Sequence, residues 1–149
     1  MPKKAPAEIG MPLWKIDTPS LILDLDKLES NLDVMAENAA NLGVKLRPHA
    51  KMHKSADIGQ KQISRGAVGL CCQKVSEAEA LIDGGIEDIL VTNQVVGTNK
   101  LKRFAELANR AKIAICVDDS KNIAEINRCA EEQGVQISIF VEVNVGGDR

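Results

Sequence analysis

Two kinds of hydrophobic pattern alternate along this chain. Short runs of apolar residues, mostly β-branched or small, are typical of buried strands, and segments whose apolar residues recur every three or four positions are typical of helices. The runs that we expect to form strands are residues 20–26, 44–48, 67–72, 88–93, 112–119 and 136–145. The segments that we expect to form helices are residues 55–65, 75–83, 98–110 and 120–133.

A further helix is expected after the first run, with Asp26 as its N-cap and Gly43 as its end. The apolar residues that give it helical spacing are Leu28, Leu32, Met35 and Ala39. The residues that we expect to cap or stop the later helices are Ser76, Thr98 and Ser120 at their starts and Gly66, Gly84 and Gly134 at their ends.

The expected strands start roughly every 20 to 25 residues, which is the length of one strand, one helix and two short loops. This repeat is typical of an α/β fold with a parallel sheet. A five-stranded doubly wound sheet would be complete at this length, whereas a (β/α)8 barrel needs about 250 residues. The sequence stops on "VNVGGDR", a glycine-rich loop directly after an apolar strand. We therefore expect the N-terminal part of a barrel, truncated after about five strands.

Composition narrows the possible functions. The 149 residues include 19 Lys and Arg against 21 Asp and Glu, so the net charge of -2 does not favour nucleic-acid binding. No apolar run reaches the roughly 20 residues that span a bilayer, and the N-terminus lacks the apolar core of a secretory signal, so we expect a cytoplasmic protein that binds no membrane. The four cysteines, Cys71, Cys72, Cys116 and Cys129, lack CxxC spacing and are expected to be free thiols.

Several catalytic motifs are absent from the sequence. There is no GxGxxG after a strand, no GxxxxGK[ST] and no G-x-S-x-G, so dinucleotide, P-loop and nucleophile-elbow chemistry have no support. The only histidines are His49 and His53. This leaves the basic stretch "LRPHAKMHKS", residues 46–55, as the main candidate for chemistry.

In that stretch Pro48 ends a strand, and alternation would put Arg47, His49 and Lys51 on one side at the carboxyl end of a βα unit. Active sites of βα barrels lie at this end. His49 and His53 form an HxxxH pair, but Pro48 opposes a helix through both and Lys51 between them would repel a dication, so we expect no metal here. A solvated basic loop is the structural alternative.

Four segments resemble a known family: "TPSLILDLDKLESNL", "LRPHAKMHKS", "AVGLCCQKVSEAEALIDGGIEDILVTNQVVG" and "VEVNVGGDR". They are similar to the D-threonine aldolase and 3-hydroxy-D-aspartate aldolase family, relatives of alanine racemase with the same pyridoxal-phosphate barrel. The resemblance implies an N-terminal arm at residues 1–17 and a partial alanine racemase-like barrel at residues 18–149.

The resemblance also implies roles for single residues. Lys51 would be the lysine that forms a Schiff base with pyridoxal 5'-phosphate, Arg149 would approach the phenolic oxygen of the cofactor, and His49 and Gln73 would contact the cofactor. An amine that reacts with an aldehyde near neutral pH is partly uncharged, and neighbouring cations such as Arg47 and His49 favour that state. Gln73 and Asn93, at strand ends, are expected to line the pocket.

The activity that the resemblance implies is cleavage of D-β-hydroxy-α-amino acids, such as D-threonine or 3-hydroxy-D-aspartate, to glycine and an aldehyde or glyoxylate. It further implies a homodimer and a divalent metal, Mg or Mn. The metal ligands, the phosphate site and the catalytic base would lie beyond residue 149, so the 149 residues alone would be inactive. The alternatives are a D-serine or 3-hydroxyaspartate dehydratase, a racemase, a non-catalytic pyridoxal-phosphate protein, and a complete doubly wound ligand-binding protein.

Overall fold

The computed structural model describes residue 5 and residues 7–147. The chain divides into two compact units, one up to Asn31 and one from Leu32 onward. The first unit contains a short 3-10 helix, η1 (Leu13–Lys15), and the beginning of α1 (Leu25–Asn41). The second unit contains the remainder of α1 and all later elements. No helix in the described part of the chain combines the length and the apolar content needed to cross a bilayer.

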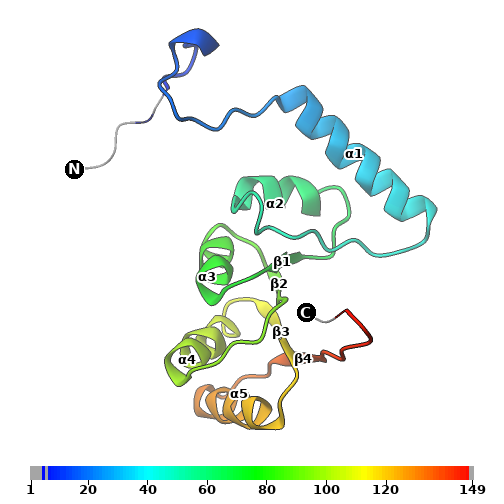
Figure 1. Ribbon diagram of the computed structural model, residues 1–149, viewed down its shortest axis with the longest axis vertical. Coiled ribbons are helices and arrows are strands. Elements are labelled where there is room, and N and C mark those ends of the chain that lie inside the picture. The colour runs from blue at the N-terminus through cyan, green and yellow to red at the C-terminus, as the bar shows by residue number, and fades with distance from the viewer. Residues whose placement is uncertain (1–4, 6, 148–149) are drawn as a thin grey trace. The chain divides into compact units, whose positions relative to one another are not determined.

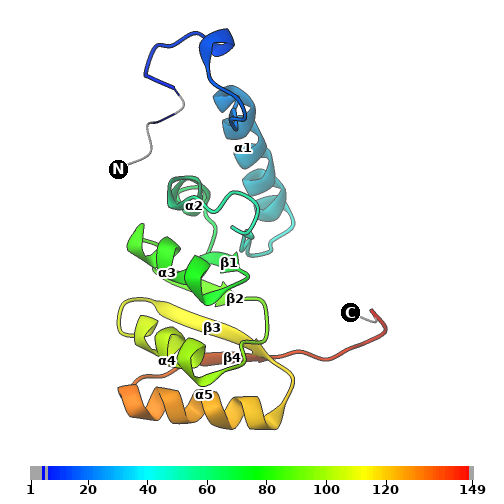
Figure 2. The same ribbon diagram turned by 60° about the vertical axis from the view of Figure 1, so that its left-hand side comes forward.

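The second unit is built on a parallel sheet with strands in the order β1-β2-β3-β4. The strands are β1 (Leu70–Cys72), β2 (Asp88–Val91), β3 (Lys112–Val117) and β4 (Ser138–Val141). The helices that alternate with them are α2 (Ala56–Ile63), α3 (Val75–Asp83), α4 (Thr98–Leu107) and α5 (Ser120–Gln133). Figures 1 and 2 show these helices in one row on one side of the sheet.

This arrangement confirms the α/β class and favours part of a barrel over a doubly wound sheet. A doubly wound sheet reverses its strand order and carries helices on both faces, whereas a barrel adds each strand beside the last one with every helix outside. The described strands follow the second pattern without a reversal.

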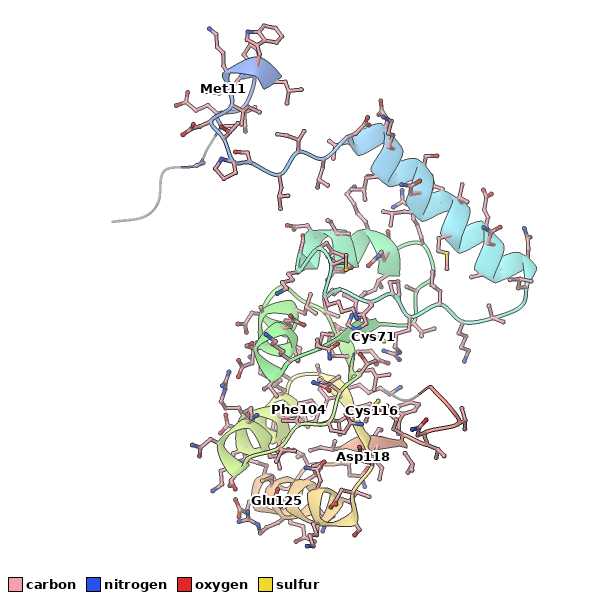
Figure 3. The ribbon with its side chains drawn as sticks, viewed as in Figure 1. Met11, Cys71, Phe104, Cys116, Asp118 and Glu125 are labelled. Carbon is pink, nitrogen blue, oxygen red and sulfur yellow. The ribbon has the colours of Figure 1, made fainter. Side chains whose placement is uncertain are left out.

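Alternation along the strands separates a helix-facing side from an inner side. Phe104 of α4 is fully buried against the helix-facing side (Figure 3). The strand residues buried with it are Leu70, Cys72, Ile89, Val91, Ile113, Ile115 and Val117. The residues between them in sequence, such as Cys71, Leu90 and Cys116, face the inner side. All four cysteines are free, as expected.

Residues 20–26 do not form the expected strand. Leu21 is fully exposed, and α1 already begins at Leu25, so Asp26 lies inside the helix. The Asp24 carboxylate caps the helix instead, because its Oδ1 accepts a hydrogen bond from the Lys27 amide at 3.1 Å. An apolar run forms a strand only where it pairs with another strand, and within the described residues this run makes no strand pairing.

Residues 44–48 also form no regular strand, although they run beside β1. The Cys71 amide donates to the Pro48 carbonyl at 2.7 Å, and the Ala50 amide donates to the Cys71 carbonyl at 2.8 Å. This gives one isolated parallel bridge, His49 to Cys71. The next hydrogen bond of the ladder would need an N–H at position 48, which proline lacks, so the ladder is interrupted there, and one further bond joins the Val68 amide to the Leu46 carbonyl at 2.9 Å.

The later helices lie where the periodicity predicts them, and their caps differ. Helices α3 and α5 have the expected bounds, whereas α2 and α4 end two and three residues earlier, at Ile63 and Leu107. The N-caps are Lys74, Gly97 and Asp119, so the expected caps Ser76, Thr98 and Ser120 lie in the first turns of their helices. Asp119 displaces Ser120 because its carboxylate accepts from the amides of Lys121 and Asn122.

The exposed strand β4 leads to a prediction about the 149-residue chain on its own. Within the described residues β4 pairs only with β3, and Phe140 and Val141 are 54% and 68% exposed. An open apolar edge promotes strand-to-strand association. We expect the isolated chain to dimerise or aggregate in sedimentation velocity, and Val141→Lys to shift it towards monomer. A wild-type chain that sediments as a monomer and unfolds cooperatively would contradict this expectation.

Candidate functional site

The basic stretch at residues 46–55 is split between the two ends of the sheet. The Arg47 guanidinium donates to the Asp88 carboxylate at 2.8 Å, and Asp88 is the first residue of β2. His49 contacts Thr92, which directly follows β2. Asp88 and Thr92 are four residues apart, which corresponds to roughly 13 Å along an extended chain. Arg47 and His49 therefore share one face, as expected, but Arg47 does not neighbour Lys51. The long side chain of Arg47 places its guanidinium at the amino end of β2.

The Arg47–Asp88 pair explains why residue 69 is a glycine. Asp88 also pairs with the Lys112 ammonium at 3.3 Å, which completes a small charge cluster at the amino ends of the strands. Gly69 has a φ of +148°, and a Cβ there would overlap both the Arg47 guanidinium and the Asp88 carbonyl. Only glycine permits this backbone and this close approach together.

A compact turn presents Lys51 at the opposite, carboxyl end of the sheet. Ala50 is 1% exposed and anchors the start of the turn, and the Lys54 amide donates back to the Ala50 carbonyl at 2.7 Å. The Lys51 side chain is exposed, and its ammonium has no hydrogen bond or ion pair with any described residue. The backbone of Lys51 is thus held while its amine is available.

The ring of His49 connects this turn to β2. Its Nδ1 accepts a hydrogen bond from the Lys51 amide at 3.2 Å, and its Nε2 lies 2.9 Å from the Thr92 hydroxyl. Burial lowers the pKa of His49 from 6.5, the Lys51 charge lowers it further, and the Glu77 carboxylate opposes both effects. His49 is therefore a neutral ring at pH 7.

Glu77 holds the other end of the turn. Its side chain is 12% exposed, and its carboxylate accepts from the Gln73 amide at 2.8 Å and pairs with the Lys54 ammonium at 3.3 Å. Lys54 has a φ of +52°, a conformation unusual for a residue with a side chain. Because Glu77 belongs to α3, this pair ties the turn to the helix that follows β1.

A polar hollow lies at the same carboxyl edge. It has a volume of about 350 Å³, and the residues that line it are Gln73, Thr92, Asn93, Gln94, Asp118, Glu142 and Asn144. Asp118 directly follows β3 (Figure 3), and the Gln94 amide donates to the Glu142 carboxylate at 2.7 Å. The loop that carries Gln94 is fixed from α5, since buried Asn122 donates to the Val95 carbonyl at 2.8 Å.

The structure brings some of the expected site residues together. His49 and Lys51 are adjacent, and Gln73 and Asn93 line the hollow, but neither His49 nor Lys51 lines it. Thr92 joins the two groups because it both lines the hollow and contacts His49. Arg149 lies outside the described residues.

The HxxxH pair does not converge on a common point. His49 contacts Thr92, whereas the His53 Nδ1 accepts from the Ser55 amide at 3.1 Å at the start of α2. Among the described residues, no group of three or more His, Cys, Asp or Glu side chains could hold a metal ion.

Sequence reasoning missed Thr92 and Glu77. Thr92 could have been found from the sequence. It is the first residue after β2, and alternation puts it on the same face as Asp88, at the end of the strand where active sites lie. Glu77 gives no such signal, because a glutamate in the first turn of a helix is ordinarily explained by the helix dipole.

The Glu77–Lys54 pair predicts a pH-dependent contribution to stability. Burial alone raises the pKa of Glu77, but the Gln73 amide and Lys54 outweigh it and the net pKa lies below the ordinary 4.5. The carboxylate therefore stabilises the fold above the unfolded-state pKa, and this stabilisation is lost as the pH falls through the lower folded-state pKa. At pH 7, Glu77→Gln should lower the free energy of unfolding by about 1 to 2 kcal/mol.

Urea denaturation at pH 7 and pH 3 measures this effect in the protein and its variants. Asp83→Asn is the matched control on α3, because Asp83 pairs with Arg110 where both side chains are at least half exposed. It should change the free energy of unfolding by about 0.5 kcal/mol or less. An equal effect of Glu77→Gln at both pH values would show that the Glu77 charge contributes nothing.

Comparison with known proteins agrees with this fold. The family described as "Alanine racemase, N-terminal domain" matches residues 23–149. The chain is 47% identical to D-threonine aldolase from Arthrobacter sp. and 49% identical to 3-hydroxy-D-aspartate aldolase from Paracoccus denitrificans, each over 97% of its length. The crystal structure of D-threonine aldolase from Filomicrobium marinum superposes with a TM-score of 0.96 at 50% identity over 99% of the chain.

The chain spans 38% of the length of these two curated relatives and 40% of the solved chain. The match covers every strand of the described sheet and the turn that carries Lys51. The chain therefore belongs to the family of the alanine racemase N-terminal domain.

Proposed function

We propose that this chain is part of a pyridoxal-phosphate-dependent aldolase that cleaves D-β-hydroxy-α-amino acids, such as D-threonine or 3-hydroxy-D-aspartate, to glycine and an aldehyde or glyoxylate. The observation that carries the proposal is the 47–50% identity, over nearly the whole chain, to proteins with these two aldolase activities. A dehydratase or a racemase of the same fold is the alternative.

The geometry around Lys51 fits a covalently held cofactor. A lysine that binds an aldehyde needs an amine free of ion pairs on a backbone that does not move, and Lys51 has both properties among the described residues. When bound, pyridoxal phosphate supplies an electron sink for the pair released as the Cα–Cβ bond breaks. Lys51 would hold the cofactor, and His49 would help by accepting a hydrogen bond from its backbone amide, because a neutral His49 does not supply the neighbouring cation that the sequence suggested.

Other parts of the proposal rest on the family resemblance. Arg149 would donate to the phenolic oxygen of the cofactor, because an arginine fixes an oxyanion without itself titrating. Gln73 and the hollow that it lines would receive the substrate. We further propose a divalent metal, Mg or Mn, bound by ligands outside the described residues, and a homodimer in the cytoplasm, where free cysteines remain reduced.

The assignment of Lys51 predicts a specific covalent adduct. The full-length protein should be yellow when loaded with pyridoxal phosphate, and borohydride should fix the cofactor on the peptide containing "PHAKMHK", because reduction converts a reversible C=N bond into a stable amine. Lys51→Ala should abolish both the colour and the adduct, as measured by absorbance and peptide mass spectrometry.

Lys45→Ala is the matched control, since Lys45 is exposed and lies six residues earlier in the same segment. It should retain colour and adduct. Lys54 is a poor control, because its removal leaves the Glu77 carboxylate without its cation. An adduct on Lys54 or Lys74, or an active colourless protein, would contradict the assignment.

The reaction type predicts distinct products. With D-threonine, the full-length protein plus Mg²⁺ or Mn²⁺ should release glycine and acetaldehyde in equal amounts, detected by chromatography and an aldehyde-linked assay. Release of ammonia and an oxoacid would instead identify a dehydratase, and appearance of the L-isomer a racemase. L-threonine is the control substrate and should give no aldehyde.

A further inference from the structure

Thr92 occupies a position between the turn of Lys51 and strand β1. Its amide donates to the Cys72 carbonyl at 2.9 Å, and its hydroxyl lies 3.2 Å from the same carbonyl and 2.9 Å from His49 Nε2. A hydroxyl has one proton to donate, so it can serve only one of these two neighbours as a donor.

The direction of these hydrogen bonds follows from the proton inventory. The Lys51 amide can only donate, so His49 Nδ1 must be the acceptor and carries no proton. A neutral ring then has its proton on Nε2, and that N–H donates to the Thr92 hydroxyl. The hydroxyl in turn donates to the Cys72 carbonyl, which can only accept.

We propose that Thr92 is a positioning residue for Lys51: its hydroxyl holds His49 in the Nε2–H tautomer, so that Nδ1 accepts the Lys51 amide and fixes the backbone of the lysine. This inference rests on the proposed function for the importance of Lys51, whereas the tautomer itself does not. The opposite tautomer would set two N–H donors against each other at the 3.2 Å separation of Nδ1 and the Lys51 nitrogen.

The two charged groups that act on His49 oppose each other. Lys51 lowers the pKa of the ring and Glu77 raises it, and neither is hydrogen-bonded to a ring nitrogen through its side chain. Only the Lys51 amide and the Thr92 hydroxyl contact the ring nitrogens at hydrogen-bonding distance among the described residues. The Thr92 hydroxyl is therefore the one side-chain group positioned to favour Nε2–H.

The test compares Thr92→Val, which keeps the shape and removes the hydroxyl, with Thr92→Ser, which keeps the hydroxyl. The tautomer is read from the ¹⁵N chemical shifts of the His49 ring in the full-length protein at pH 8, assigned with His49→Gln. The second readout is hydrogen exchange of the Lys51 amide. Thr92→Val should raise the Nδ1–H population and speed this exchange roughly three- to tenfold, the range for one lost hydrogen bond. Thr92→Ser should match the wild type.

The inference is overturned if the wild-type ring is Nδ1–H, if Thr92→Val changes neither readout, or if Thr92→Ser behaves like Thr92→Val. A wild-type ring in the Nδ1–H form would overturn the inference even if Thr92→Val fails to fold. Neither readout needs bound cofactor, and borohydride labelling is done separately. A missing adduct on Lys51 with the expected tautomer would therefore reject the proposed function and leave the role of Thr92 towards the Lys51 backbone intact.

Discussion

The arrangement around Lys51 depends on how residues 46–50 pair with β1. The chain makes one parallel bridge, at His49, and the ladder is interrupted before it because Pro48 has no N–H, although the Val68 amide still donates to the Leu46 carbonyl. Ala50 remains hydrogen-bonded and buried, and the chain turns away immediately after it. If this segment were a regular strand, residues 51–54 would stay extended beyond the carboxyl end of β1. The Ala50 carbonyl, which a continued ladder would pair with the neighbouring chain, instead accepts from the Lys54 amide at 2.7 Å, so the backbone folds into a turn with Lys51 at its start.

The two ends of the sheet have different chemistry. At the amino ends, Arg47 and Lys112 both pair with the Asp88 carboxylate, and Gly69 leaves room for the Arg47 guanidinium. At the carboxyl ends, the polar side chains of Asp118, Glu142 and their neighbours surround an open hollow. The ion pairs at the amino ends connect neighbouring strands, whereas the polar groups at the carboxyl ends remain accessible to a ligand. Active sites of βα barrels generally lie at the carboxyl ends of the strands.

The sequence predicted the helices and the central strands well, because periods of 2 and 3.6 report directly on which faces are buried. It failed at residues 20–26, where an apolar run has no partner strand, and partner strands are a tertiary property. It put Arg47, His49 and Lys51 on one side by alternation, but Lys51 lies in a turn where alternation no longer applies, and the long side chain of Arg47 reaches Asp88 at the amino end of β2. Lys51 and His49 were selected by alternation at a strand end and then by a resemblance, and Gln73 by its position at a strand end, whereas the role of Thr92 depends on a contact between residues 43 positions apart.

The fixed backbone beneath a free side chain has a consequence for the conformational entropy of Lys51. Ordering the side-chain torsions of a lysine costs on the order of 2 kcal/mol, and ordering a mobile loop would add about 1 to 2 kcal/mol for each residue. Because the turn is already held through Ala50, His49 and Glu77, attachment of a cofactor orders only the side chain. If the amine of the substrate took the place of Lys51 in the proposed reaction, the lysine side chain would regain its freedom. The entropy returned would favour release of the lysine and would confine the change to a single residue.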